Sequence, residues 1–255
     1  MRAGFIIPVY NHGSTLKDVL ASVLQYRLPV IIVDDGNDSA NATLIDEAAQ
    51  SFSSSGLVYV VRRPKNGGKG LAMRDGVLYA LSLSLTHAFQ VDADGQHDIS
   101  ACGTFLNAAE SEPEALISGI PVYDESVPLK RKRGRKISTA WVHVATLDKN
   151  ISDALCGFRI YPLAAYKKVL DSHAFIDSRM GYDADILVHL KWEGVAIREL
   201  PVRVSYPKDG VSNFRMVGDN IRISLMFARL TLGMIVRLPL FALRAIRRRT
   251  GKSNG

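Results

Sequence analysis

The 255-residue sequence is poor in cysteine and contains no long uninterrupted hydrophobic run. Its two cysteines, Cys102 and Cys156, are too few for a disulfide framework or for a zinc site built from cysteines. Arginines interrupt the apolar C-terminal region before it reaches the roughly 18 uncharged residues of a membrane-spanning helix. The chain also begins without the basic segment and long apolar stretch of a signal peptide. We therefore expect a cytoplasmic protein.

Two common phosphate-binding motifs are also missing. A P-loop would need a glycine where Arg63 precedes Gly68-Lys69, and the terminal Gly251-Lys252-Ser253 has Ile246 at the same position. The first expected strand is followed by residues 8–13 without the pattern G-x-G-x-x-G, which argues against a dinucleotide site. A nucleotide would have to be held in another way.

Positive charge is concentrated in two segments. The net charge is +7, yet residues 215–255 alone carry nine basic residues and one acid, so the rest of the chain is close to neutral. The second segment, Lys130 to Lys136, has six basic residues in seven positions. This distribution does not fit a uniformly basic nucleic-acid binder, and no aromatic residues alternate with the basic ones for base stacking. We expect no nucleic-acid partner.

Short β-rich apolar runs alternate with helical periodicity, which is typical of an α/β fold with a mostly parallel sheet covered by helices. Residues 1–214 are predicted to form one domain, residues 215–255 to form a C-terminal appendage, and the basic run 130–136 to lie in a loop. Helices are expected at 14–24, 71–81, 137–147, 164–170 and 183–192. Strands are expected at 5–9, 30–33, 57–61, 88–91, 115–119, 155–161 and 196–205.

Polar residues follow the ends of the first expected strands. These are residues 8–11, Asp34-Asp35-Gly36, residues 65–70 and residues 92–95. In open α/β sheets ligands bind beyond the carboxyl ends of the strands, so the four segments are expected around one crevice.

Asp92-Ala93-Asp94 is the most informative of these segments. Two carboxylates two positions apart on an extended strand end point to the same side, and the small Ala93 between them lets them share one hard cation such as Mg²⁺ or Mn²⁺. A cation there would neutralise the charge that builds on a nucleoside-diphosphate leaving group. The alternative is a solvated acidic turn, which the position after a buried-looking strand disfavours.

Two further segments are candidates for nucleotide contacts. Asp35 could accept hydrogen bonds from a nucleobase or ribose, although Asp-Gly after a strand is also an ordinary turn signal. Gly68 allows close backbone approach, and Lys69 brings an ammonium group to the start of a helix, where amide donors favour a phosphate. A glycine-rich turn with incidental lysines is the alternative.

Taken in order, five segments resemble the motifs of family 2 glycosyltransferases, and most of all those of the polyprenol-phosphate (dolichol-phosphate) mannosyl and glucosyl transferase branch. The resemblance covers about residues 4–214. It implies a GT-A fold with a Rossmann-like nucleotide-binding half, an inverting mechanism and Mg²⁺ or Mn²⁺. The segments are Pro8-Val9-Tyr10-Asn11, Val33-Asp34-Asp35-Gly36, Asn66-Gly67-Gly68-Lys69-Gly70, Asp92-Ala93-Asp94-Gly95-Gln96-His97 and Cys156-Gly157-Phe158-Arg159-Ile160-Tyr161.

The resemblance also implies roles for individual residues. Those implied around the nucleoside of a UDP- or GDP-sugar are Pro8, Tyr10, Asn11 and Asp35. Those implied at the diphosphate and the metal are Gly68, Lys69, Asp92, Asp94 and Gln96. Arg159 is implied near a lipid-linked acceptor.

Two departures from the family pattern concern that acceptor. The usual Gly-Ser-Arg at a strand end appears here as Gly119-Ile120-Pro121, and the usual Arg-x-x-Gly-x-Ser-Lys appears as residues 208–213 with lysine for arginine and asparagine for lysine. The basic run 130–136 is a candidate replacement for the missing cation, and a solvated charged face is the alternative.

The kind of acceptor decides whether the reaction needs a general base. A phosphate is already ionised, whereas a hydroxyl must lose a proton to a carboxylate as the sugar transfers. The sequence leaves both acceptors open. The candidate bases are Asp153, Asp183 and Asp185.

The C-terminal region combines aliphatic residues with regularly spaced arginines. Arg222 and Arg229 are seven residues apart, as are Arg237 and Arg244, so each pair is expected on one helix face. Pro239 is expected to divide the region into two amphipathic helices. Such helices are typical of a peripheral protein on an anionic membrane, here the inner face of the cell membrane. Packing on the body or on a partner subunit, as in a homo-oligomer, is the alternative.

The sequence therefore predicts an inverting glycosyltransferase that moves a sugar from a nucleoside-diphosphate sugar to a lipid-linked acceptor at the cytoplasmic membrane face. A catalytically silent module that binds a nucleotide sugar or a membrane is the competing hypothesis.

Overall fold

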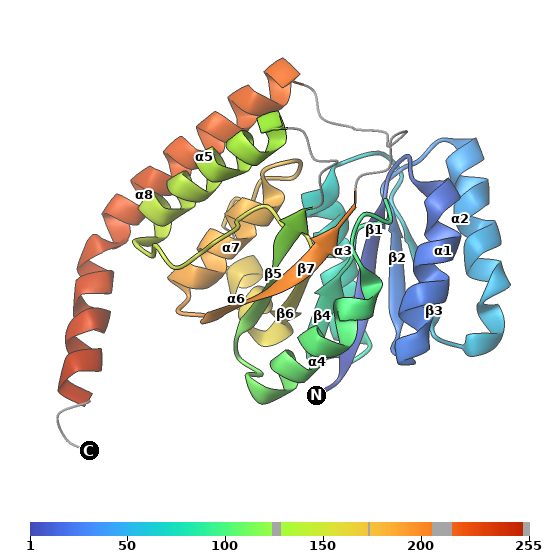
Figure 1. The fold of residues 1–255 in the computed structure, drawn as a ribbon, viewed down its shortest axis with the longest axis horizontal. Coiled ribbons are helices and arrows are strands. Elements are labelled where there is room, and N and C mark those ends of the chain that lie inside the picture. Colours follow the sequence, from blue (N-terminus) through green and yellow to red (C-terminus); the bar gives the residue numbers. More distant parts are fainter. Residues whose placement is uncertain (124–128, 173, 206–215, 252–255) are drawn as a thin grey trace.

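The fold is a layered α/β structure built around one seven-stranded sheet (Figure 1). The computed structural model describes residues 1–123, 129–172, 174–205 and 216–251, with side chains for these residues apart from 129–132, 216–217 and 240–251. The strands are β1 (Ala3–Val9), β2 (Val30–Asp34), β3 (Val58–Arg62), β4 (His87–Gln90), β5 (Leu116–Tyr123), β6 (Arg159–Pro162) and β7 (Ile197–Val204).

The sheet is mostly parallel, as the alternation of strands and helices predicts. Its strand order is β3-β2-β1-β4-β6-β5-β7, and β6 runs antiparallel to both of its neighbours, β4 and β5. Because β6 lies next to β4, the chain segment that precedes β6 is brought beside the end of β4. The second half of the chain therefore reaches the strand ends of the first half.

Helices cover both faces of the sheet because successive strand side chains point to opposite sides. In β1, Phe5, Ile7 and Val9 pack with one buried cluster, whereas Ile6 packs with the other. The first face is covered by α1 (Gly13–Val23), α2 (Ser39–Ser51) and α4 (Cys102–Ser111). The second is covered by α3 (Lys69–Ser82), α5 (Leu129–Thr146), α6 (Leu163–Asp171), α7 (Tyr182–Trp192) and α8 (Met216–Gly251).

Two expected elements differ in extent from the prediction. The strand expected at 155–161 forms only over β6, because the backbone of residues 155 and 156 donates to the Asp153 carboxylate and not to a neighbouring strand. The basic run 130–136, expected in a loop, lies in the first turns of α5. Lysine and arginine are good helix formers, so a run of them continues a helix readily.

The predicted division of the C-terminal region into two helices is wrong. Residues 216–251 form the single helix α8 with Pro239 inside it. Pro239 is exposed, so the carbonyl that loses its partner at this turn can be solvated, and the fixed φ of proline is compatible with a helix.

The first half of α8 packs on the body of the protein. Met226, Phe227, Leu230 and Met234 are buried against the second face, and the Phe227 ring stacks on Trp141 of α5 with 6.3 Å between centroids. Figure 1 shows α5 and α8 side by side along this edge of the molecule. No helix in the described part of the chain has the length and apolar character needed to cross a bilayer.

We predict that a methyl group added at Gly76 destabilises the fold. A Cβ at this position of α3 would lie 2.6 Å from a methyl carbon of Ile6, so α3 would have to move off the sheet. Gly76→Ala should lower the free energy of unfolding by ~1–3 kcal/mol. Gly134→Ala is the matched control, because Gly134 on α5 has no atom within 4 Å of the added Cβ, and it should stabilise by ~0.5–1 kcal/mol. Urea denaturation measures both, and equal unfolding midpoints would contradict the packing argument.

Candidate active site

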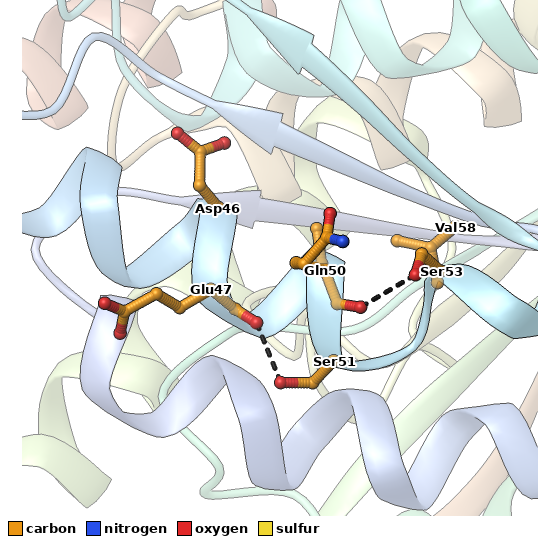
Figure 2. A pocket seen from close by; sticks show the side chains of 7 residues that line it. Asp46, Glu47, Gln50, Ser51, Ser53 and Val58 are labelled. Atoms are coloured by element: carbon orange, nitrogen blue, oxygen red, sulfur yellow. Dashed lines mark hydrogen bonds between the residues drawn. The ribbon is translucent and has the colours of Figure 1, made fainter.

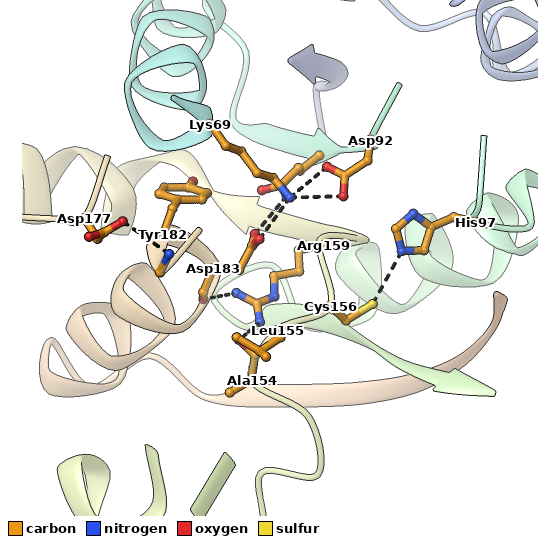
Figure 3. Close-up of polar contacts among 12 residues, drawn as sticks. Lys69, Asp92, His97, Ala154, Leu155, Cys156, Arg159, Asp177, Tyr182 and Asp183 are labelled. Atoms are coloured by element: carbon orange, nitrogen blue, oxygen red, sulfur yellow. Dashed lines mark hydrogen bonds and ion pairs between the residues drawn. The ribbon is translucent and has the colours of Figure 1, made fainter. Parts of the chain in front are cut away.

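The candidate site lies beyond the carboxyl ends of the central strands. Its centre is Lys69, the first residue of α3, whose Nζ contacts the carboxylates of Asp92 after β4 and Asp183 in α7 (Figure 3). The Nζ lies 2.8 and 3.0 Å from the two oxygens of Asp92 and 2.9 Å from Oδ2 of Asp183. One ammonium group thus joins two segments that are 91 residues apart in the sequence.

The charges of this cluster hold one another in their ionised forms. Burial alone would lower the pKa of Lys69, but the charges of Asp183 and Asp92 more than offset it, and the pKa lies well above its usual value. Burial alone would likewise raise the pKa of Asp92, but the neighbouring Lys69 and His97 hold it below its usual value. The cluster is therefore an ion-paired centre.

Gly157 has no side chain, and the charged cluster occupies the space where one would lie. A Cβ at this position would lie 2.6 Å from both Lys69 Nζ and Asp92 Oδ2, and 2.8 Å from Gln90 Nε2. Any side chain at 157 would therefore push the ion pair apart. The glycine is in one of the five motifs, yet the sequence alone did not indicate which contact requires it.

Asp94 has a different environment from Asp92. Its Oδ1 accepts a hydrogen bond of 3.0 Å from the backbone N–H of Gln96. Burial and the nearby charge of Asp92 raise the pKa of the Asp94 carboxyl above its usual value. The repulsion between the two carboxylates is the kind of strain that a bound cation relieves.

The residues present fit a hard divalent cation. Asp92 and Asp94 supply carboxylate oxygens, which Mg²⁺ and Mn²⁺ prefer, and their like charges are only partly compensated by protein groups. Among the described residues, no three histidine, cysteine or acidic side chains are grouped as a metal site. Two carboxylates suit a cation that takes its remaining ligands from phosphate oxygens and water.

Gln90, which the sequence analysis did not select, positions Asp183. It is fully buried at the end of β4, where its Nε2 donates to Asp183 Oδ1 at 3.0 Å and its Oε1 accepts a hydrogen bond from Tyr161 at 2.9 Å. A polar residue two positions before Asp92, at the buried end of the strand, was the signal that could have identified it.

Arg159, implied near the acceptor by the resemblance, is fully buried beneath the cluster. Its guanidinium donates to the backbone carbonyls of Asp183 and Ala154 and to Ser118 Oγ at 3.1 Å. Figure 3 shows it between the Asp183 turn and the residue 154–156 segment. The side chain therefore fixes the backbone that carries Asp183.

Asp35 organises the glycine-rich turn. Its carboxylate accepts hydrogen bonds from the backbone N–H groups of Gly67 and Gly68, at 3.0 and 2.8 Å, and from Asn66 Nδ2 at 3.0 Å, and it pairs with Arg63 Nε at 2.9 Å. Four donors thus surround a side chain that is only 2% exposed.

Several amides at the start of α3, a segment expected to favour a phosphate, form hydrogen bonds within the protein. The N–H groups of Gly67 and Gly68 donate to Asp35, and that of Gly70 donates to the carbonyl of Ser178 at 2.9 Å. Gly68 has a positive φ of 93°, and a Cβ there would lie 2.3 Å from the Ser178 oxygen. These three amides are therefore engaged within the protein, and the ammonium of Lys69 is the group from this segment that contacts Asp92 and Asp183.

The other nucleoside candidates lie at the end of β1, which is hydrogen-bonded to the segment that follows β2. Asn37 Oδ1 accepts the N–H of Asn11 at 2.8 Å, and Asn37 Nδ2 donates to the Val9 carbonyl at 2.9 Å. Asn11 adopts a positive φ of 60°, which turns the chain away from the strand. Pro8 and Tyr10, both partly buried, flank Val9 at this edge.

The remaining candidate bases lie away from Lys69. Asp153 forms a bidentate pair with Arg135, at 2.8 and 2.7 Å, and accepts the N–H groups of residues 155 and 156. Asp185 is fully buried and pairs with Arg229 of α8. The family pattern at residues 208–213 lies outside the described residues.

Two surface hollows differ in their relation to this centre. One, of about 580 Å³, adjoins Asp94 and His97 and is also lined by Thr15, Ser22 and Tyr26. The larger, of about 810 Å³, lies on the outer side of α2 around Asp46, Glu47 and Val58 (Figure 2). The larger hollow contains none of the candidate residues.

Comparisons with known proteins identify the family of the chain. The model of glycosyl transferase family 2 matches residues 5–175. A dolichyl-phosphate beta-glucosyltransferase of Trichomonas vaginalis is 26% identical over 247 residues, which cover 88% of this chain and 73% of that protein. A UDP-N-acetylglucosamine–dolichyl-phosphate N-acetylglucosaminyltransferase of Methanococcus voltae is 21% identical over 245 residues, which cover 91% of this chain and 96% of that protein.

The fold has solved counterparts. Glucosyl-3-phosphoglycerate synthase of Mycobacterium tuberculosis, solved with Mn²⁺, UDP-glucose and phosphoglyceric acid, superposes with a TM-score of 0.60 at 15% identity, over 91% of this chain and 79% of that one. This likeness confirms the predicted GT-A fold. The family model matches more than half of this chain, so the chain belongs to glycosyl transferase family 2.

Proposed function

We propose that this chain transfers a sugar from a nucleoside-diphosphate sugar to a lipid-linked phosphate, with inversion at the anomeric carbon and with Mg²⁺ or Mn²⁺, at a membrane surface. In this reaction the acceptor phosphate oxygen forms a bond to the anomeric carbon as the bond from that carbon to the diphosphate oxygen breaks. The nucleoside diphosphate leaves as an anion.

The donor assignment is supported by the acidic pair and Lys69. Asp92 and Asp94 would hold the cation, which supplies charge neutralisation for the leaving diphosphate when it is bound. Lys69, held by two carboxylates, is positioned to offer its remaining hydrogen-bonding capacity to the same group. The solved neighbour with Mn²⁺ and UDP-glucose supports a UDP-sugar as the first donor to test.

The observation that carries the acceptor assignment is the engagement of all three candidate bases. Asp183 is bound by Lys69 and Gln90, Asp153 by Arg135, and Asp185 by Arg229. A carboxylate whose oxygens are already occupied by cations and amides is a poor proton acceptor. A phosphate acceptor needs no proton removed, and the dolichyl-phosphate transferases among the relatives use such an acceptor by name.

The same engagement supports inversion. A retaining enzyme with a covalent intermediate needs a free carboxylate to attack the anomeric carbon, and these three carboxylates are not free. Direct attack by the acceptor on the face opposite the leaving group gives the inverted product.

A membrane surface is supported by the outward face of α8. Ile221, Leu225, Leu232, Ile235 and Val236 are exposed large apolar residues. Their spacing places them along one stripe of the helix. Such a stripe suits the apolar part of a bilayer interface.

Helix α5 extends this surface. Ile137, Trp141 and Val144 are exposed on α5 beside α8, and Trp141 is of the type enriched at membrane interfaces. Arg133 and Lys136 are exposed at the start of this face, which matches anionic lipid headgroups. Arg229 and Arg237 do not belong to this surface, because they contact Asp185 and the Trp192 ring.

We predict that Asp94→Asn abolishes metal-dependent turnover. The substitution removes one anionic ligand while keeping the side-chain shape, so turnover of UDP-glucose at saturating Mn²⁺ should fall at least ~100-fold with unchanged circular dichroism. Asp98→Asn is the matched control, because Asp98 caps the next turn through Ser100 and lies outside the Lys69 cluster. Full turnover by the Asp94 variant would remove the metal-site assignment.

We predict transfer to polyprenyl phosphate and none to the corresponding polyprenol near neutral pH, because only the phosphate is ionised without a base. Product formation with UDP- and GDP-sugars is followed by mass spectrometry, and NMR coupling constants give the anomeric configuration. Equal transfer to the alcohol would contradict the phosphate assignment, and retention would contradict inversion. Nucleotide binding without transfer to either acceptor would favour the catalytically silent module.

We predict that acidic residues on the apolar stripe of α8 release the protein from membranes. Leu225→Glu combined with Leu232→Glu should lower cosedimentation with anionic phospholipid vesicles at least ~10-fold, because each leucine contributes ~1.5–3 kcal/mol when buried in an apolar phase. Leu78→Glu is the control, since Leu78 is an exposed leucine of α3 on another part of the surface. If vesicle binding is unchanged while a wild-type dimer dissociates in the double variant, the stripe is a subunit interface.

A further inference from the structure

Arg229 faces inward from α8 and contacts the segment that leads into α7. Its Nη2 pairs with the Asp185 carboxylate and its Nη1 donates to the Phe175 carbonyl. The guanidinium also stacks on the Phe175 ring, with Cζ 4.8 Å from the centroid. One side chain of the C-terminal helix therefore binds both the loop at residues 174–181 and the first turn of α7.

Asp185 requires this arginine. Its side chain is fully buried, and its Oδ2 also accepts the backbone N–H of Asp177 at 2.5 Å. His189 is the next nearest cationic candidate, with Nε2 3.4 Å from Oδ1 and without hydrogen-bond geometry. Removing the arginine would leave a buried carboxylate without a full countercharge, which is costly in a folded protein.

The loop at residues 174–181 rests on the glycine-rich turn of the candidate site. The Ser178 carbonyl accepts the N–H of Gly70 at 2.9 Å, and Arg179 Nη1 donates to Asn66 Oδ1 at 3.3 Å. Gly68 has no space for a side chain because the Ser178 oxygen is so close. A displacement of this loop would therefore displace the turn that carries Lys69.

The first turn of α7 is held from both sides. Asp183 and Asp185 are two residues apart, so their side chains leave the helix in nearly opposite directions. Asp183 reaches Lys69 at 2.9 Å, and Asp185 reaches Arg229. The position of Asp183 relative to Lys69 thus depends on contacts on the far side of the same turn.

We infer that Arg229 is a positioning residue for the donor site, which it controls through Asp185 and the loop at residues 174–181. It makes α8 a part of the nucleotide-binding machinery as well as a membrane-facing helix. The inference rests on the proposed function, because it assumes that Lys69 and the glycine-rich turn receive a nucleoside diphosphate.

The test compares Arg229→Met with Arg237→Met in the full chain. Arg237 also anchors α8 on α7, with its Cζ 4.3 Å from the Trp192 ring, but it lies at the other end of α7 and forms no hydrogen bond or ion pair with the described residues 174–181 or with Lys69. Both variants should lower the melting temperature. Binding of UDP with Mn²⁺ is measured by calorimetry, and KM is measured for UDP-sugar and for polyprenyl phosphate.

Arg229→Met should weaken UDP binding and raise the donor KM at least ~10-fold, since small displacements of binding groups have large effects. The acceptor KM should stay unchanged, and Arg237→Met should bind UDP like the wild type. Arg229→Lys keeps the charge opposite Asp185 and should recover part of the UDP affinity. It replaces Arg229→Met in the comparison if that variant does not fold. Equal UDP affinity of the Arg229 and Arg237 variants would overturn the inference alone. If the wild type bound neither UDP nor GDP, both the proposed function and this inference would be overturned.

Discussion

The ion pairs of Lys69 with Asp92 and Asp183 are the interaction on which the rest of the site depends. They join the end of a central strand to a helix from the second half of the chain, at distances of 2.8 to 3.0 Å. Removing one member of such a partly buried group leaves the others without a countercharge, which typically costs ~3–5 kcal/mol. The side-chain-free Gly157, the buried amide of Gln90 and the buried guanidinium of Arg159 all maintain this one contact.

This constraint also limits the chemistry that the site can perform. Lys69 and Gln90 contact the two oxygens of Asp183, and arginines pair with Asp153 and Asp185, so the three candidate bases are held as structural anions. Burial and the nearby charge of Asp92 together raise the pKa of the Asp94 carboxyl, so the two acids are only partly compensated by protein groups. A site of this kind is suited to stabilising a departing diphosphate and to using an acceptor that is already ionised.

Helix α8 connects this chemistry to the surface of the molecule. Its inward side contributes Met226, Phe227 and Leu230 to the core and Arg229 to the buried Asp185, whereas its outward side carries an exposed apolar stripe. The proposed membrane surface would cover this stripe. The two sides of α8 therefore face different environments, and its inward contacts reach the loop that rests on the glycine-rich turn.

The α/β fold and its mostly parallel sheet could be predicted from the sequence, because apolar runs and helical periodicity are local patterns that can be recognised without knowledge of contacts. The sequence also selected Asp92, Asp94, Asp35 and Lys69, since polar residues after buried strands must lie at one edge of such a sheet. The partner of each charged side chain, in contrast, became known only from the folded structure. The pairs of Lys69 with Asp183 and of Arg229 with Asp185 are 114 and 44 residues apart, and no local pattern encodes a partner at that separation. The burial of Arg159 and the continuous helix through Pro239 were likewise decided by surroundings that a linear pattern does not contain.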